Sequence, residues 1–185
     1  MQVADSVGTR LSILEQQTAF RGLGDIMDHI NPGQIMQSVR RLFGGEPARL
    51  QVAALPWRRA ANGIEVMLIT SRVGGRWVLP KGWPEAGEEL CAAAAREAHE
   101  EAGLIGAVSS SMAGRYTYVK SDAGEGMRCE VMVYPLEVGA SAGKWKEKGQ
   151  RRRKWLSPDK AAKRVAETEL AELIREFAGA LQAAA

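Results

Sequence analysis

The sequence predicts an α/β fold in which helices pack against a mixed β-sheet, with a helical extension at the N-terminus. From residue 50 onward, short apolar segments rich in β-branched and aromatic residues alternate with turn residues such as Asn62-Gly63 and Gly74-Gly75, as expected for strands. Residues 88–102 are rich in Ala and Glu and contain no Gly or Pro, which predicts a helix. Because strands and helices alternate along the chain, the helices are expected to cover the sheet.

The composition is that of an ordinary globular protein. Its 185 residues, with 45% hydrophobic and 25% charged residues, suit one domain with a full core and an additional arm. The two cysteines, Cys91 and Cys129, are not in a CxxC pair, which argues against a disulfide framework and a thiolate zinc site. The sequence lacks a signal-like start and an apolar stretch long enough for a membrane span, so we expect a cytoplasmic protein.

Two regions are distinguished by their patterns. Residues 1–46 contain apolar positions at helical spacing, interrupted by Gly and Pro, and are expected to form a helical arm. Residues 47–185 are expected to form the main domain. The second helical patch of the arm is amphipathic; packing against the domain or against a second subunit, in a homodimer, is favoured over contact with a membrane surface.

Within the main domain the pattern predicts both element types. Strands are expected at 50–57, 63–72, 76–80, 114–119, 128–137 and 154–156. Helices are expected at 88–102, where Gly103 takes the position after the last turn, and from about residue 158 with a break near residue 168.

Three carboxylates gather on one face of the helix at 88–102. At 100° per residue, Glu97, Glu100 and Glu101 lie on the face that also carries its apolar residues. Like charges at this spacing cost a few tenths of a kcal/mol each unless a cation joins them. Carboxylate oxygens suit Mg²⁺ or Mn²⁺. On the helix alone, a solvated acidic face with an Arg96–Glu100 ion pair explains the pattern equally well.

The wider motif favours the metal site. Residues 82–104 read GWPEAGEELCAAAAREAHEEAGL, which resembles the Nudix box, Gx5Ex7REUxEExGU, where U is a bulky or aliphatic residue. The fixed positions are matched by Gly82, Glu88, Arg96, Glu97, Glu100, Glu101 and Gly103. The resemblance implies an α/β/α sandwich with a mixed sheet and metal-dependent hydrolysis of phosphoanhydride bonds.

The resemblance also implies a role for each residue of the box. The implied metal ligands are Glu97, Glu100, Glu101 and the backbone carbonyl of the loop at Gly82. Glu97 and Glu101 are the principal ligands, and Glu100 is a ligand or the general base that activates water. Arg96 and Glu88 form a supporting ion pair.

Outside the box, the chain is similar to diphosphoinositol polyphosphate phosphohydrolases and diadenosine polyphosphate hydrolases. The similarity rests on Ser71-Arg72, on Arg128 and on the RRRKW run at 151–155, and the Pro80-Lys81-Gly82 sequence is more like the dinucleoside enzymes. Guanidinium groups match phosphate oxygens. The candidate substrate-binding residues are Arg58, Arg59, Ser71, Arg72, Lys81, Arg128, Arg152 and Arg153.

Other activities fit the same motif. The basic segment 144–154 is compatible with removal of pyrophosphate from RNA 5′ ends, and an ADP-ribose-type pyrophosphatase is a further alternative. A non-catalytic nucleotide-binding module on the same scaffold is a remote alternative, because such proteins usually lose carboxylates of the box and this chain keeps them all.

Overall fold

The computed structural model describes residues 47–120 and 126–183. The chain divides into two units at residues 47 and 48, and nearly all described residues belong to the second unit. The predicted helical arm, 1–46, lies outside the described residues. The strands are β1 Arg49–Ala60, β2 Gly63–Thr70, β3 Trp77–Val78, β4 Lys81–Gly82, β5 Leu104–Val108, β6 Gly114–Lys120, β7 Met127–Ser141 and β8 Arg153–Leu156. The helices are α3 Leu90–Ala102, α4 Pro158–Ala162 and α5 Thr168–Ala183.

The strands form one mixed sheet, as predicted. Its central order is β3-β2-β1-β7-β5, and β4, β6 and β8 pair with β1, β7 and β2 respectively. The long central strands β1 and β7 run parallel over nine residue pairs, from Arg49↔Cys129 to Trp57↔Glu137. All the other pairings in the described part of the chain are antiparallel.

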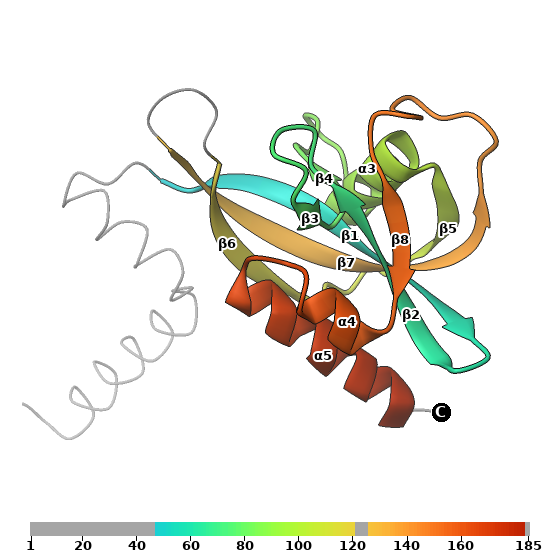
Figure 1. Ribbon diagram of the computed structural model, residues 1–185. Coiled ribbons are helices and arrows are strands. Elements are labelled where there is room, and N and C mark those ends of the chain that lie inside the picture. The colour runs from blue at the N-terminus through green and yellow to red at the C-terminus, as the bar shows by residue number, and fades with distance from the viewer. Residues whose placement is uncertain (1–46, 121–125, 184–185) are drawn as a thin grey trace, which may run out of the picture. The chain divides into compact units, whose positions relative to one another are not determined.

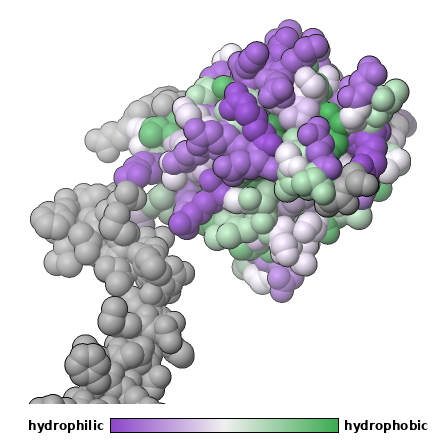
Figure 2. All heavy atoms as spheres, turned by 90° about the horizontal axis from the view of Figure 1, so that it is seen from below, coloured by the Kyte–Doolittle hydropathy of each residue, from purple (hydrophilic) through white to green (hydrophobic). Residues whose placement is uncertain are grey.

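Helices cover both faces of the sheet, so the predicted α/β/α sandwich is confirmed (Figure 1). On one face, α3 packs a stripe of fully buried alanines against β1, β2 and β7. Their small side chains let the helix backbone lie close to the sheet. On the other face, α5 buries Leu170, Leu173 and Ile174 together with Leu55 and Leu68 of the sheet. Hydrophilic residues cover much of the face seen from below (Figure 2), as expected where a helix turns its apolar side inward.

Of the strand predicted at 76–80, only Trp77–Val78 is a strand, β3, and a second short strand, β4, follows the predicted range at Lys81–Gly82. β3 pairs with β2, whereas β4 pairs with β1, because the chain changes partners at Leu79 and Pro80. Pro80 has no N–H to donate to a ladder, but its carbonyl accepts a hydrogen bond from Ala54 N at 3.0 Å. This crossing carries Lys81 and Gly82 from the edge of the sheet to a place beside α3.

The sequence did not predict β5. This strand follows α3 directly and pairs with the end of β7, with a shift in register between Ile105 and Gly106. Its five residues, LIGAV, are too short and too irregular to show the alternation of a half-buried strand. No helix in the described part of the chain is long and apolar enough to cross a membrane.

Candidate active site

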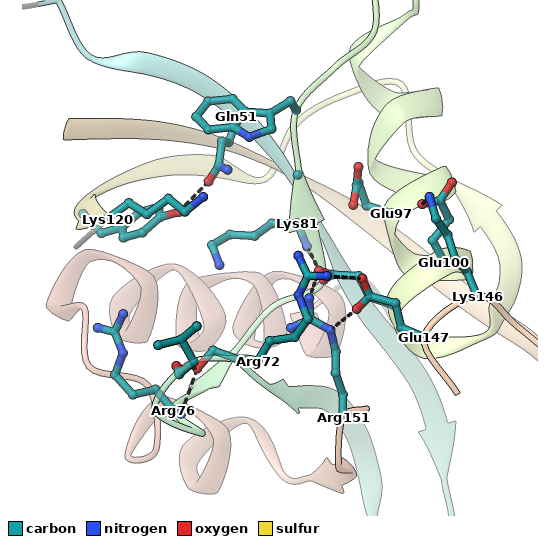
Figure 3. Close-up of a pocket in the computed structure, with 16 residues that line it drawn as sticks. Gln51, Arg72, Arg76, Lys81, Glu97, Glu100, Lys120, Lys146, Glu147 and Arg151 are labelled. Carbon is teal, nitrogen blue, oxygen red and sulfur yellow. Dashed lines mark hydrogen bonds and ion pairs between the residues drawn. The ribbon is translucent and has the colours of Figure 1, made fainter. Parts of the chain in front are cut away.

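A cavity of about 450 Å³ lies between α3, β1, β4 and β6. Figure 3 shows Glu97 and Glu100 of α3 on one side of it, and Lys81, Lys120 and Arg76 facing them from the other elements. Glu97 and Glu100 thus face Lys81, Lys120 and Arg76 across a single space.

The three carboxylates of α3 all line this cavity, but each is paired with its own cation. Glu97 accepts a hydrogen bond from Arg96 Nη1 at 2.8 Å, and Glu100 forms an ion pair with Lys146 Nζ at 2.6 Å. Glu101 forms an ion pair with Arg151 Nη2. Of the three, Glu100 has the most exposed side chain, at 28% against 13% for Glu97 and 10% for Glu101.

The arrangement differs from the expectation in one respect. Among residues 47–120 and 126–183, no three acidic, histidine or cysteine side chains converge closely enough to hold one ion as they lie. The helical spacing brings Glu97, Glu100 and Glu101 to one cavity, and each carboxylate is paired there with a basic side chain. The donor set still fits a hard divalent cation, since it consists of carboxylate oxygens beside backbone.

Burial perturbs two of these carboxylates. Desolvation raises the pKa of Glu101 to about 7, although Arg151 and the backbone N–H of Lys81, which donates to Glu101 Oε2 at 3.0 Å, act in the opposite direction. Desolvation also raises the pKa of Glu97, against the opposing effect of its bond to Arg96. Carboxylates that are costly to ionise in the absence of a counter-ion are favourable places for a cation.

Gly82 is required by the position of Glu97. A Cβ atom added to Gly82 would lie 2.5 Å from Glu97 Oε2 and closer still to Cδ and Oε1. Ordinary van der Waals contact begins near 3.4 Å, so any side chain here displaces the carboxylate. The glycine therefore allows the β4 backbone and the Glu97 carboxylate to border the same point.

Three of the predicted substrate-binding residues line the cavity. They are Ser71 and Arg72, which follow β2, and Lys81 of β4. Arg72 Nη1 lies 3.3 Å from Glu147 Oε1. Burial lowers the pKa of Lys81, while the nearby Glu101 acts in the opposite direction.

The other five predicted residues do not line this cavity. Arg58 and Arg59 border a separate space of about 370 Å³ near Trp155, and Arg58 donates two hydrogen bonds to Glu65. The side chain of Arg152 lies over the ring of Trp77, and that of Arg153 over the ring of Trp145. Arg128 is exposed on β7.

The match to known families agrees with this geometry. Residues 48–177 match the NUDIX domain family, which is most of the chain and the whole of the sandwich up to α5. The chain belongs to the Nudix family. The α/β/α sandwich, the carboxylates on α3 and the adjoining glycine are therefore the Nudix fold and its box.

Named Nudix relatives support the assignment, and a solved structure shares the fold. The chain is 30% identical over 122 residues to Nudix hydrolase 18, mitochondrial, of Arabidopsis thaliana, with 66% of each chain covered. It is 35% identical to Nudix hydrolase 16, mitochondrial, of the same plant, over 62% of this chain and 71% of that one. The C. elegans Ap4A hydrolase binary complex superposes with a TM-score of 0.57 at 22% identity, covering 74% of this chain and 99% of that one. The last comparison shows the shared fold.

An ion pair between Arg96 and Glu88 stabilises the Nudix box. Arg96 donates from Nε to Glu88 Oε1 and from Nη2 to Glu88 Oε2, both at 2.9 Å, and Nη2 also donates to the carbonyl of Trp83 at 3.0 Å. The predicted Glu88–Arg96 pair is thus present. The hydrogen bond from Arg96 lowers the pKa of Glu88 to about 2. The pair ties the loop before α3 to the middle of the helix.

Several residues of the Nudix cavity were not predicted. The additional charged lining residues are Arg76, Lys120, Lys146, Glu147 and Arg151. Lys146, Glu147 and Arg151 come from the segment between β7 and β8, which returns across the end of α3, where Glu147 N donates to the Glu100 carbonyl at 3.0 Å. The sequence signalled this segment by its excess of basic residues, but only the fold shows that Arg151 lines the cavity and that Arg152 and Arg153 do not.

Proposed function

We propose that the protein hydrolyses phosphoanhydride bonds in a polyphosphate substrate, with Mg²⁺ or Mn²⁺ as cofactor. The observation that carries the proposal is the cavity itself, in which the carboxylates of α3 face basic side chains of β4, β6 and the segment after β2. The matched relatives carry the name Nudix hydrolase. Because the chain spans 66% of the first relative's length, its activity is inferred from its own site.

In this proposal Glu97, Glu101 and the backbone at Gly82 would hold the metal. Glu100 would be either a further ligand or the general base. A divalent cation held there would supply positive charge for the phosphoryl oxygens and would lower the pKa of a bound water molecule. Glu100, the most exposed of the three, is placed to take the proton of that water. The water oxygen then bonds to phosphorus, the bridging P–O bond breaks, and the leaving phosphate carries away the electron pair. Arg96 and Glu88 keep Glu97 in place.

Basic residues on the opposite side hold the substrate. Ser71, Arg72 and Lys81 are proposed to contact its phosphates, together with Arg76 and Lys120, which line the same space. The substrate is a diphosphoinositol polyphosphate or a dinucleoside polyphosphate. Because a structure named as the C. elegans Ap4A hydrolase shares the fold, a dinucleoside polyphosphate is included among the substrates to be tested.

The test is phosphate and pyrophosphate release from a substrate panel with and without Mg²⁺. Glu101→Gln keeps the size of the side chain and removes its charge, so we expect turnover to fall at least about 1000-fold while the thermal unfolding profile remains cooperative. Glu176→Gln, an exposed change on α5, is the matched control. A folded, fully active Glu101→Gln variant, or metal-independent turnover, would contradict the proposal.

Removal of pyrophosphate from RNA 5′ ends is the second candidate. The observation that favours it is the basic segment 144–154, which brings Lys146 and Arg151 into the cavity. Triphosphorylated RNA, ADP-ribose, diadenosine tetraphosphate and a diphosphoinositol polyphosphate, assayed at equal ionic strength, separate the candidates. Binding of these compounds without hydrolysis would indicate the non-catalytic module.

The arm and the location are further parts of the proposal. We propose that residues 1–46 form a helical arm that supports a homodimer, and that residues 47–185 are the hydrolase domain. Light scattering of the full chain and of residues 47–185 tests this. If the particles contain the same number of chains in both cases, the proposal is contradicted. The two free cysteines suit a reducing compartment such as the cytoplasm, which fractionation of the cells checks.

A further inference from the structure

The segment between β7 and β8 brings a further carboxylate, that of Glu147, into the cavity. Glu147 lies outside the Nudix box, yet it lines the same space as the glutamates of α3. Its backbone N–H donates to the Glu100 carbonyl at 3.0 Å, so its main chain is held at the end of α3. Its side chain is only 12% exposed. A carboxylate buried to this extent requires cations or hydrogen-bond donors around it.

Glu147 lies between two arginines and contacts a different one with each oxygen. Oε1 lies 3.3 Å from Arg72 Nη1, and Oε2 accepts a hydrogen bond from Arg151 Nε at 2.5 Å. Figure 3 shows the carboxylate directed at both side chains. The side chain of Arg72 is 64% exposed, whereas that of Arg151 is 7% exposed. Because an exposed arginine can adopt many rotamers, the contact with Glu147 restrains Arg72 at the cavity.

Arg151 connects Glu147 to Glu101. Its Nη2 forms an ion pair with Glu101, and its Nη1 donates to the Thr70 carbonyl at 3.0 Å. All three nitrogens of this guanidinium therefore have an acceptor, which fixes the orientation of the planar group. Glu101 is held from its other oxygen by the backbone N–H of Lys81 at 3.0 Å. The orientation of the Glu101 carboxylate thus depends on Arg151, and that of Arg151 depends on Glu147.

The charges along this row of contacts alternate. Each charged side chain contacts one of opposite sign, in the order Arg72, Glu147, Arg151 and Glu101. A buried charge that loses its partner is costly. Without Glu147, the positive charge of Arg151 would be balanced by Glu101 alone. A divalent cation at Glu101 would then face the full charge of that guanidinium, so its binding would be weakened.

We infer that Glu147 is a positioning residue, which holds Arg72 toward the substrate and, through Arg151, holds Glu101 toward the metal. The inference rests on the proposed function, because it assigns Glu147 a part in the same reaction. It deepens that proposal by adding a residue from outside the Nudix box that acts on both the substrate and the metal.

The first experiment is isothermal titration calorimetry of the full chain with Mn²⁺ in the absence of substrate. Groups that orient a metal ligand are worth roughly 10–100-fold in metal affinity, and Glu147 acts one contact further away, so Glu147→Gln should weaken Mn²⁺ binding about three- to tenfold. Glu130→Gln is the matched control and should leave the affinity unchanged, because Glu130 also pairs with an arginine, Arg115, but does not line the cavity.

The outcomes of this titration separate the inference from the proposed function. If the unchanged protein binds Mn²⁺ and Glu147→Gln binds it equally well, the inference is overturned and the proposed function stands. If the unchanged protein does not bind Mn²⁺, the proposed function is contradicted, and the inference falls with it.

Steady-state kinetics at saturating Mg²⁺ tests the contact with Arg72. With a substrate that the protein hydrolyses, Arg72→Met and Glu147→Gln should each raise KM about three- to tenfold. The double variant should raise KM no further than Arg72→Met alone, because residues that act through one contact are not additive. Multiplied effects in the double variant would contradict the inference. An unchanged KM in Arg72→Met would contradict it even if Glu147→Gln does not fold.

The same measurements distinguish positioning from a direct role of Glu147 in the reaction. A positioning residue should lower kcat much less than Glu101→Gln does, and Glu147→Asp, which keeps the charge, should recover most of the loss in Mn²⁺ affinity. A fall in kcat as large as that of Glu101→Gln, with Mn²⁺ affinity unchanged, would show that Glu147 itself acts on the water molecule and would overturn the inference.

Discussion

The close approach of Gly82 to Glu97 makes Gly82→Ala a sensitive probe of the site. The added Cβ atom would lie 2.5 Å or less from the carboxylate atoms, and ordinary contact begins near 3.4 Å, so the carboxylate must move by about 1 Å. A misplacement of this size at a catalytic group costs roughly 100-fold in rate. We therefore expect kcat to fall about 100-fold, because in the proposed mechanism the displaced carboxylate holds the metal and not the substrate.

The control is Gly139→Ala on β7. A Cβ atom there meets nothing within 4 Å, so activity should stay within about twofold of the unchanged protein. Steady-state kinetics with saturating Mg²⁺ measures both variants, and urea unfolding checks that each is folded. If Gly82→Ala turns over as fast as Gly139→Ala, Glu97 does not act from the position described, and the reasoning fails.

Three further predictions concern stability. Replacing Arg151 by Met leaves Glu101 buried without its cation and should lower the free energy of unfolding in urea by about 3–5 kcal/mol. The exposed Arg175→Met should lower it by under about 0.5 kcal/mol. Equal losses in the two variants would contradict this. Gly103→Ala should destabilise the fold by at least about 1 kcal/mol, because Gly103 has φ +65° and an added Cβ would lie 2.6 Å from the Trp145 ring. An unchanged midpoint of urea unfolding would argue against this packing of Gly103 and Trp145. The pKa of Glu101 is raised from 4.5 to about 7 in the folded protein, so the folded state holds the proton more tightly. Without metal, the contribution of Glu101 to stability should therefore be greatest below about pH 4.5 and should be lost as the pH rises through 7. Glu101→Gln should remove this part of the pH dependence.

Local patterns specified most of the secondary structure. The helix expected at 88–102 is α3 at Leu90–Ala102, and Gly103 ends it with φ +65°. The strand expected at 128–137 is β7 at Met127–Ser141. These elements depend on side-chain periodicity and on turn residues that lie within a few positions of each other, which a sequence displays directly.

Elements that depend on a distant partner were predicted less well. β5 exists because it pairs with the far end of β7, and β4 because the chain leaves β2 for β1 after Pro80. Neither segment is long enough to show a pattern of its own. Their strand conformation comes from hydrogen bonds to chain that is far away in the sequence.

The sequence by itself determined the acidic face of the site. The spacing of Glu97, Glu100 and Glu101 on one helix, with Gly82 and the Glu88–Arg96 pair, specified an acidic face and its support, because helical geometry converts spacing into direction. Only the tertiary structure decided which basic residues meet that face. It brought Lys81, Lys146 and Arg151 to the carboxylates and left Arg58, Arg59 and Arg128 elsewhere, because the direction of a side chain from a strand or loop depends on register and on the path between elements.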